Sequence, residues 1–508
     1  MRRITYGPPG TGKTERLLKT IEIFLRFGVE PEKIGYFTFS KNAAINGKER
    51  AASKVNKPIN RFPFFQTLHS FCFKQMGLDQ SRVMQPKHYH ELGNDLDIEI
   101  EGGYKQDQDH DGTLRYDNPY LQLIHKARAL MLQPLEYYDK YESDDTEIKR
   151  NKLDIIFEGL NIYKEEKGMV DFDDMLERYV NGYFDKETNR KIEFVPPEFK
   201  VVFLDEAQDC SGMQWKLFNK IEERSEYRVV TGDDDQGIYK WNGADVDTFI
   251  NLKGKRRILK QSHRVPKEPF KVADRIIKRV TNRVDKEYYP KEEDGLVKHC
   301  QTLHEIDFTK GKWLVLATAN YMLNDIGDVL DEKGLYWQRR NATPRVKNIY
   351  EIIQNWDKLR TGIPMHYNDC KKIFNKMNKN WDKKLFKGMA KDKFYDIDTL
   401  KNDYGLKTEA DWKEALDELG NSDIRKIIKL TEAGEDLSKN PRISISTIHG
   451  VKGNERENVV VHTELSGKAY EDYLKNPDDT HRLFYVACTR TEKNLFIMEP
   501  KRSKAYDI

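Results

Sequence analysis

The first half of the chain alternates short apolar runs with amphipathic or polar helical stretches. Residues 4–6 can form a short strand, and residues 15–27 follow with the periodicity of an amphipathic helix. Residues 34–40 form a β-rich apolar run that leads into a polar helical stretch. Comparable apolar runs return at residues 201–204 and 228–232. Strands that alternate with covering helices predict an α/β protein with a parallel sheet.

Small hydroxyl residues accompany two of these apolar runs. Ser40 ends the run at residues 34–40, and Ser70 lies near the end of a further run at residues 64–71, so we expect each at the carboxyl end of a strand. The carboxyl ends of parallel strands form the edge where open α/β sheets bind ligands. Two interpretations stay open at this point: the hydroxyl groups face a ligand, or they only cap the helices that follow.

The composition indicates a soluble protein with more than one buried core. The chain has 508 residues, 34% of them charged, and its mean hydropathy is -0.81. It lacks an apolar run of the roughly eighteen residues that a membrane span needs, and its start lacks the layout of a signal peptide. We therefore expect a cytoplasmic protein without a membrane partner. The 87 basic residues nearly balance 84 acidic ones, so the net charge does not by itself indicate nucleic acid.

The cysteines are widely scattered and contain no C-x-x-C pair. This spacing predicts ordinary buried thiols and indicates neither a zinc site nor a disulfide framework. The five residues are Cys72, Cys210, Cys300, Cys370 and Cys488.

A phosphate-binding loop is predicted close to the start of the chain. Residues 7–14 have the full G-x-x-x-x-G-K-T spacing, between the short strand and the amphipathic helix. In such a loop the backbone N–H groups point into one cavity, Lys13 reaches the terminal phosphates, and the Thr14 hydroxyl is a ligand of Mg²⁺. The predicted nucleotide-binding residues are Gly7, Pro8, Pro9, Gly10, Thr11, Gly12, Lys13 and Thr14.

Acidic residues follow the two later apolar runs. Asp205 and Glu206 end the first of them, where Asp205 is predicted to hold Mg²⁺ and Glu206 to orient and deprotonate an attacking water. The second run leads into three consecutive aspartates and then Gln236, which we expect to sense a γ-phosphate. The three aspartates can also be a simple turn.

Tyr239 and Trp241 lie two residues apart just beyond Gln236. In an extended segment they share one face and can form a stacking platform for unpaired bases. The alternative is that both rings pack in the core.

Two clusters of acidic residues invite a metal interpretation. Asp107, Asp109, Asp111 and Gly112 resemble the start of an EF-hand loop, but the position of the bidentate glutamate is Asn118. The carboxylates at residues 171–174 can hold a metal or cap a helix start, and we favour the cap.

Eight ordered segments together resemble the motifs of superfamily 1 helicases of the UvrD/Rep/PcrA type. They span the whole chain and cover well under half of its residues. The segments are residues 7–14, 38–44, 67–69, 205–209, 232–241, 261–264, 446–455 and 482–490.

The resemblance implies an α/β fold with two RecA-like parallel-sheet P-loop domains, each with a mainly helical insertion. ATP is expected in the cleft between the two domains, with single-stranded DNA across their tops. The expected boundaries are 1–77 and 197–259 for the first core domain, 78–196 for its insertion, 260–342 and 441–508 for the second core domain, and 343–440 for its short insertion.

The resemblance also implies roles for individual residues. Arg264 and Arg490 are expected to stabilise charge on the transferred phosphoryl group, and with Lys13, Asp205, Glu206 and Gln236 they form the expected catalytic set. Glu455 is expected to hydrogen-bond the ribose, and His263 to stack on the base where relatives carry tyrosine. The expected DNA-contacting residues are Phe39, Thr67, His69, Tyr239, Trp241, Thr447 and His449.

The function that the resemblance implies is ATP-driven, Mg²⁺-dependent translocation 3′ to 5′ on single-stranded DNA, with unwinding of duplexes at single-strand/duplex junctions. Alternatives are a remodeller that displaces proteins from DNA, a translocase of opposite polarity, an AAA+ ATPase, and a scaffold with a degenerate ATPase. The family usually carries a glutamine that reads adenine before the P-loop, and the residues before Gly7 leave no room for it. We therefore expect relaxed nucleotide selectivity.

One stretch of the expected second insertion is strongly basic. Residues 371–401 contain ten lysines against four aspartates, with aromatic residues between them. This pattern suits a nucleic-acid backbone. A solvated helix face is the alternative.

Overall fold

The computed structural model describes residues 2–100, 105–106, 114–116, 118–142, 148–185, 188–340 and 342–508. The chain forms two compact units. The first comprises residues 1–299, 316–318 and 447–508, and the second comprises residues 300–315 and 319–446.

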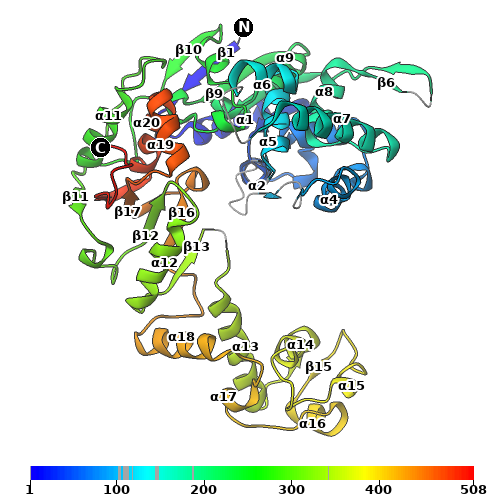
Figure 1. The fold of residues 1–508 in the computed structure, drawn as a ribbon, viewed down its shortest axis with the longest axis vertical. Helices are drawn as coiled ribbons and strands as arrows, with labels where there is room; N and C mark the ends of the chain where they lie inside the picture. Colours follow the sequence, from blue (N-terminus) through cyan, green and yellow to red (C-terminus); the bar gives the residue numbers. More distant parts are fainter. Residues whose placement is uncertain are drawn as a thin grey trace. The chain divides into compact units, whose positions relative to one another are not determined.

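A parallel six-stranded sheet forms the centre of the first unit (Figure 1). Its strands pair in parallel throughout, which confirms the α/β class. The order is β10 (Lys255–Ile258), β1 (Arg2–Tyr6), β9 (Ser225–Gly232), β8 (Phe199–Asp205), β2 (Ile34–Thr38) and β3 (Phe65–Gln66). Because β8 is apolar on both faces and fully covered, the predicted run at residues 201–204 is buried at every position.

Helices cover both faces of this sheet. Leu17, Leu18 and Ile21 of α1 (Lys13–Arg26) pack on one face together with Val201 and Phe203. Trp215, Leu217 and Phe218 pack in the core of the other face. The helices next to the sheet also include α2 (Lys41–Lys54), α3 (Leu68–Gln75) and α9 (Gly212–Glu222), which carries Trp215.

The hydroxyl residues Ser40 and Ser70 differ in position: Ser40 caps a helix, and Ser70 lies within one. Ser40 is the N-cap of α2 and accepts a hydrogen bond from the Ala43 N–H at 3.1 Å, so the capping interpretation is correct there. The run at residues 64–71 is mostly helical, and Thr67 caps α3 by accepting from the Ser70 N–H at 3.2 Å. Ser70 therefore lies inside a helix, and the expectation that it ends a strand was wrong.

The chain between β3 and β8 in the sequence forms a group of helices with its own hydrophobic core. Tyr89, Leu121, Leu153 and Ile156 are among its buried residues. A short hairpin of β6 (Tyr183–Asp185) and β7 (Arg190–Ile192) reaches away from these helices (Figure 1). The other elements are β4 (Lys105–Gln106), β5 (Leu114–Arg115), α4 (Pro86–Asp95), α5 (Pro119–Ala129), α6 (Pro134–Tyr141), α7 (Arg150–Glu166) and α8 (Phe172–Asn181). The EF-hand-like residues 107, 109, 111 and 112 lie outside the described residues.

Each unit also contains strands outside the first sheet. In the first unit the strand order is β11 (Leu296–Cys300), β18 (Thr491–Met498) and β17 (Arg456–His462). The buried helix α20 (Pro477–Cys488) lies between β17 and β18 in the sequence. In the second unit the order is β12 (Trp313–Ala317), β16 (Ile443–Thr447) and β13 (Trp337–Arg339). The pairs β17–β18 and β13–β16 are parallel, as the sequence predicts for a second α/β sheet.

The second unit continues into helices that share one core around Trp356 and Trp381. Most aromatic residues of the basic stretch belong to this core. Trp381 and Tyr395 are buried, whereas Phe394 is 68% exposed. The basic stretch therefore uses most of its aromatic residues for packing, and DNA contact by its lysines stays a prediction. The elements are α12 (Met322–Glu332), α13 (Arg345–Arg360), β14 (Met365–His366), α14 (Tyr367–Phe374), α15 (Lys383–Phe386), β15 (Phe394–Tyr395), α16 (Ile397–Tyr404), α17 (Trp412–Ala415) and α18 (Asn421–Glu432).

Two further sequence expectations can be compared with the fold. All five cysteines are free and buried, as predicted. Every helix in the described part of the chain is too short or too polar to cross a bilayer.

Candidate nucleotide and nucleic-acid site

The predicted phosphate loop leaves β1 and enters α1. The Gly7 N–H donates to the Gly232 carbonyl at 3.0 Å, which fixes the loop against β9. Gly10 and Gly12 both have φ of 75°, a left-handed conformation that suits glycine. At Gly10 a Cβ atom would lie 2.5 Å from the Arg264 Cβ, so this close approach requires glycine twice over.

Lys13 and Thr14 lie at the start of α1, where helix N–H groups favour an anion. The Lys13 ammonium donates to the Gly7 carbonyl at 2.5 Å. The Thr14 hydroxyl donates to Asp205 Oδ2 at 3.1 Å, and the Tyr36 hydroxyl donates to the same oxygen at 3.2 Å. A hydroxyl and a carboxylate in contact are the oxygen donors that Mg²⁺ takes alongside substrate phosphates, so these residues fit that ion.

The two carboxylates after β8 are in different electrostatic states. Burial, followed by the charge of Glu206, raises the pKa of Asp205 to about 6. Burial also raises the pKa of Glu206, but the charges of Lys13 and Lys452 outweigh it and hold that pKa below its ordinary value. Glu206 therefore stays ionised, which is the state that a general base needs.

Glu206 also has an unusual backbone. Its φ of 51° and ψ of 42° place a non-glycine residue in the left-handed region. Such residues cluster at functional sites because the surrounding structure must hold them in place. Here the Gln208 side-chain amide donates to Glu206 Oε2 at 2.7 Å and contributes to that support.

Gln236 connects two separate parts of the sequence. Its amide nitrogen donates to Asp233 Oδ2 at 2.7 Å, and its amide oxygen accepts from Arg490 Nη2 at 2.9 Å. Arg490 is 2% exposed and also donates to the Val486 carbonyl at 3.1 Å. Burial and the nearby charge of Arg264 lower the pKa of Arg490 to about 10, so it remains a cation at neutral pH.

The segment after β10 lies directly on the phosphate loop. The Ser262 hydroxyl donates to the Pro9 carbonyl at 2.9 Å, and the His263 N–H donates to the Gly10 carbonyl at 2.9 Å. Arg264 forms an ion pair with Glu455, with 3.1 Å between Nη2 and Oε2. The expected phosphate-contacting arginine and the expected ribose-contacting glutamate are thus partners in this structure.

Two lysines that the sequence analysis did not assign hold this region together. Lys452 Nζ contacts Asp209 Oδ2 at 2.5 Å and donates to the Gln236 carbonyl at 2.9 Å. Lys286 is buried and contacts the carboxylates of Asp233, Asp234 and Asp235. The predicted turn of three aspartates is therefore a charged cluster around one buried lysine.

The sequence indicated the importance of only one of these two lysines. Lys452 lies within the helicase-like segment at residues 446–455, so its position gave a signal. Lys286 lies outside every recognised segment and gave none.

The expected DNA-contacting aromatics come together, but in a different way from the prediction. Lys240–Asn242 form a 3₁₀ turn, so the segment is not extended and the rings of Tyr239 and Trp241 meet at 62° with their centroids 6.4 Å apart. Tyr239 is buried, stacks on Phe39 at 5.4 Å, and donates from its hydroxyl to the His449 carbonyl at 3.1 Å. Trp241 and His449 are also neighbours, with ring centroids 5.9 Å apart.

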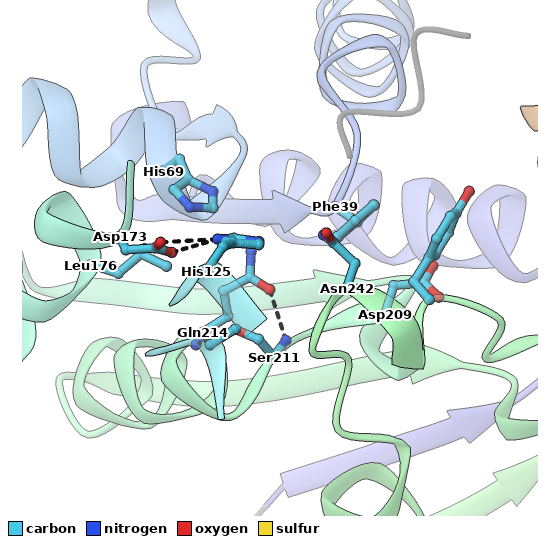
Figure 2. Close-up of a pocket in the computed structure, with 11 residues that line it drawn as sticks. Phe39, His69, His125, Asp173, Leu176, Asp209, Ser211, Gln214 and Asn242 are labelled. Carbon is cyan, nitrogen blue, oxygen red and sulfur yellow. Dashed lines mark hydrogen bonds and ion pairs between the residues drawn. The ribbon is translucent and has the colours of Figure 1, made fainter. Parts of the chain in front are cut away.

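The remaining expected DNA contacts differ in how their polar groups are used. Thr67 caps α3, and the Thr447 hydroxyl accepts from the Gly450 N–H at 3.1 Å. His69 Nε2 is buried and makes no hydrogen bond with any described residue. Figure 2 shows His69 beside His125 and Asp173 in a small cavity that Phe39 also lines.

The acidic cluster at the start of α8 is a helix cap. Asp171 and Asp174 form a reciprocal capping box, as favoured from the sequence. Arg128 and Lys164 neutralise both carboxylates, with Lys164 Nζ 2.7 Å from Asp171 Oδ2 and Arg128 Nη2 2.7 Å from Asp174 Oδ1. In the described part of the chain, no cluster of three metal-ligating side chains was found.

The pair of His125 and Asp173 predicts a pH-dependent contribution to stability. Their side chains are buried and 2.9 Å apart, and although burial lowers the pKa of His125, Asp173 raises it above its ordinary value. A raised histidine pKa stabilises the fold fully below the unfolded pKa of about 6.5, and the contribution is lost as the pH rises through the folded value.

We expect His125→Gln to destabilise the protein most below about pH 6.5 and less at higher pH. Urea unfolding of both proteins across this pH range measures the difference. His304→Gln, at an exposed position, serves as the control. A difference that grows with rising pH would contradict the assignment.

Two family models match the chain. The UvrD/REP helicase N-terminal domain matches residues 3–256, and the UvrD-like helicase C-terminal domain matches residues 442–498. The first match covers half of the chain and includes the P-loop, both carboxylates after β8, and Gln236.

Curated relatives give the same result at low identity. The chain is 26% identical over 300 residues to the ATP-dependent DNA helicase PcrA of Bacillus subtilis (strain 168), covering 56% of this chain and 39% of the relative. It is 24% identical over 331 residues to the probable DNA helicase II homolog of Mycoplasma capricolum, covering 62% and 45%. It is 23% identical over 360 residues to PcrA of Leuconostoc citreum, covering 68% and 45%. The matched part is less than half of each relative's length. Taken with the family models, these similarities show that the chain belongs to the UvrD/Rep helicase family.

Proposed function

We propose that this protein is an ATP-dependent DNA helicase that moves 3′ to 5′ on single-stranded DNA and unwinds duplexes. One observation carries the proposal. Gln236 contacts Arg490 beside the nucleotide site, and Tyr239, only three residues later, stacks on Phe39 in the aromatic cluster. The group that senses phosphate and a group that contacts DNA thus belong to one short loop.

The nucleotide end of this loop has the parts that phosphoryl transfer needs. Lys13 binds the terminal phosphates, and Glu206 orients and deprotonates the attacking water. Thr14 and Asp205 would hold Mg²⁺, which when bound neutralises phosphate charge. Arg490 supplies positive charge to the transferred group, with its guanidinium oriented by Gln236.

Nucleotide binding would also replace the ion pair between Arg264 and Glu455. In their ion pair each neutralises the other. A ribose hydroxyl hydrogen-bonded to Glu455 and a phosphate beside Arg264 replace that ion pair with two contacts to substrate. Arg264 is therefore available to phosphate only when the nucleotide competes with Glu455.

The partly exposed rings of the aromatic cluster, those of Phe39 and Trp241, suit unpaired bases, which stack on ring faces regardless of sequence. We therefore propose single-stranded DNA and single-strand/duplex junctions as partners, with ATP as the fuel. Because both are intracellular, we propose a cytoplasmic location. Displacement of bound proteins during translocation is the alternative outcome that the same motor would produce.

Lys13→Ala is expected to reduce DNA-stimulated ATP hydrolysis by at least about 100-fold, because its cation faces the terminal phosphates. Steady-state phosphate release measures the effect. Lys19→Ala, an exposed lysine of the same helix, is the control and should keep normal turnover. A Lys13→Ala protein with normal ATPase activity would favour a scaffold with a degenerate site.

Duplexes with a single-stranded tail on one end test the polarity. We expect ATP-dependent strand separation with a 3′ tail and none with a 5′ tail. Unwinding only from the 5′ tail would reverse the polarity. ATPase activity that displaces a bound protein from either substrate without strand separation would indicate the remodeller.

A further inference from the structure

A strongly basic pocket lies at the β10 edge of the first sheet, and no residue of the phosphate loop lines it. Its volume is about 300 Å³. No acidic residue is among the described residues that line it. Six cationic residues do so: Arg3, Arg16, Arg228, Lys255, Arg256 and Arg257.

The fold brings these cations together from separate segments. The parallel register places Arg3 opposite Lys255 and Thr5 opposite Arg257. Because side chains alternate along a strand, every second residue of β1 and β10 faces the same side of the sheet. Arg16 belongs to α1 and Arg228 to β9, so one helix and three strands supply the charge.

The cations divide into two groups. Arg228 donates to the Glu222 carbonyl at 2.9 Å and Arg256 to the Ile250 carbonyl at 2.9 Å, so both are held by the main chain. The side chains of Arg3, Arg16, Lys255 and Arg257 make no hydrogen bond or ion pair with any residue that the structure describes. The Lys286 cluster of the same unit, by contrast, contains both cationic and anionic side chains.

Electrostatics within the pocket indicate a missing counter-charge. Burial and then the charge of Arg257 lower the pKa of Arg16, so these two cations repel one another. A multivalent anion bound between them would remove that repulsion. Arginine guanidinium groups match phosphate oxygens in geometry as well as charge.

The rim of the pocket carries an aromatic ring. Tyr227 is 46% exposed and its ring lies 5.3 Å from that of Phe24. Lys200 Nζ also lies 5.8 Å from the centroid of this ring. A partly exposed ring beside guanidinium groups is the combination that binds single-stranded nucleic acid, with phosphates on the cations and a base on the ring. An acidic peptide would use the cations but would leave the ring without a stacking partner.

We propose that this pocket binds phosphates of a nucleic-acid strand, as a second contact separate from the Phe39 and Tyr239 cluster. It lengthens the strand that one protein molecule holds. It requires no nucleotide, because none of its cations belongs to the proposed catalytic set.

The test is the salt dependence of binding to fluorescent oligo-dT in the absence of ATP. A strand of about 40 nucleotides is several times longer than one binding site of roughly 4 to 16 nucleotides. The variant Arg3→Gln/Arg16→Gln/Arg257→Gln removes three cations. Loss of three phosphate contacts should reduce the slope of log K against log salt by about 2, which weakens binding about 100-fold at about 0.1 M salt.

A matched triple variant is the control. Arg275→Gln/Lys298→Gln/Lys475→Gln removes three exposed cations elsewhere in the same unit and should leave the slope unchanged. Thermal melting and DNA-stimulated ATPase activity with a short saturating strand should be normal for both variants. These readouts separate a failure of this proposal from a failure of the helicase proposal.

Competition with inorganic tripolyphosphate distinguishes the source of the phosphate. Tripolyphosphate should displace the long strand from the wild-type pocket and weaken its binding toward that of the pocket variant. If the pocket variant binds the strand with the same slope as the control, the proposal is overturned. The same holds if the substitutions abolish tripolyphosphate binding while strand binding is unchanged, because the pocket would then take free phosphate.

Discussion

Replacing Arg490 with alanine is expected to lower the turnover number for ATP hydrolysis by about 10³-fold to 10⁵-fold. The guanidinium is buried, close enough to the charges of Arg264 and Glu206 to interact with both, and oriented by Gln236 at 2.9 Å. An oriented cation in a site that excludes water stabilises phosphoryl-transfer charge far more than one in solvent. Single-turnover hydrolysis with DNA present measures the chemical step.

Folding and nucleotide binding must be followed in parallel, because Arg490 also donates to the Val486 carbonyl. We expect the Arg490→Ala protein to bind a non-hydrolysable ATP analogue within a few-fold of the wild type. Arg490→Lys keeps the charge without the planar fork and should recover only part of the rate. Arg275→Ala, at an exposed position, is the neutral control. Normal turnover in Arg490→Ala would remove this arginine from the catalytic set.

The second large effect concerns stability. Lys286→Met should destabilise the first unit by about 3–5 kcal/mol, because it leaves three buried carboxylates without their shared cation. Arg283, whose guanidinium contacts Asp235 at 2.6 Å, remains and neutralises only one of them. Urea unfolding followed by hydrogen exchange of β9 amides reports on this unit. Lys278→Met removes an exposed ion pair with Asp274 and should cost well under about 1 kcal/mol.

The deficit of Lys286→Met should depend on pH. Burial already raises the pKa of Asp234 to about 6, against the opposing charge of Lys286. Without that charge the pKa rises further, so the folded variant binds more protons than the unfolded chain and gains stability as the pH falls. The difference from wild type should therefore shrink as the pH falls from the raised Asp234 pKa of the variant toward the wild-type value of about 6, and should level off below it. A difference that stays constant with pH would show that packing, rather than charge, is lost.

The parts of the site that the sequence predicted are those encoded by neighbouring residues. The P-loop spacing, the carboxylates after β8 and the alternation of strands and helices each depend on a few consecutive positions, and each lies where it was expected. The predicted stacking of Tyr239 and Trp241 on one face was wrong because a 3₁₀ turn replaces the extended segment there. Local spacing alone does not distinguish these two backbones.

The parts that escaped prediction are long-range charge contacts. Lys286 joins aspartates about fifty positions earlier in the sequence, and Lys452 joins Asp209 more than two hundred positions earlier. The helicase-like segment around Lys452 marked its position but not its partner, and nothing in the pattern around Lys286 distinguishes a buried lysine from a solvated one. The basic pocket escaped for the same reason, because its cations meet only when β1, β9, β10 and α1 are assembled.

The left-handed backbone at Glu206 sets stability against activity at one position. Glycine fits that conformation at lower energy than any residue with a side chain, by about 1 kcal/mol. It cannot deprotonate a water molecule, however. Selection for a more robust fold and selection for the proposed role of Glu206 as a base therefore favour different residues here, and we expect a family member with glycine or asparagine at this position to have lost nucleotide hydrolysis.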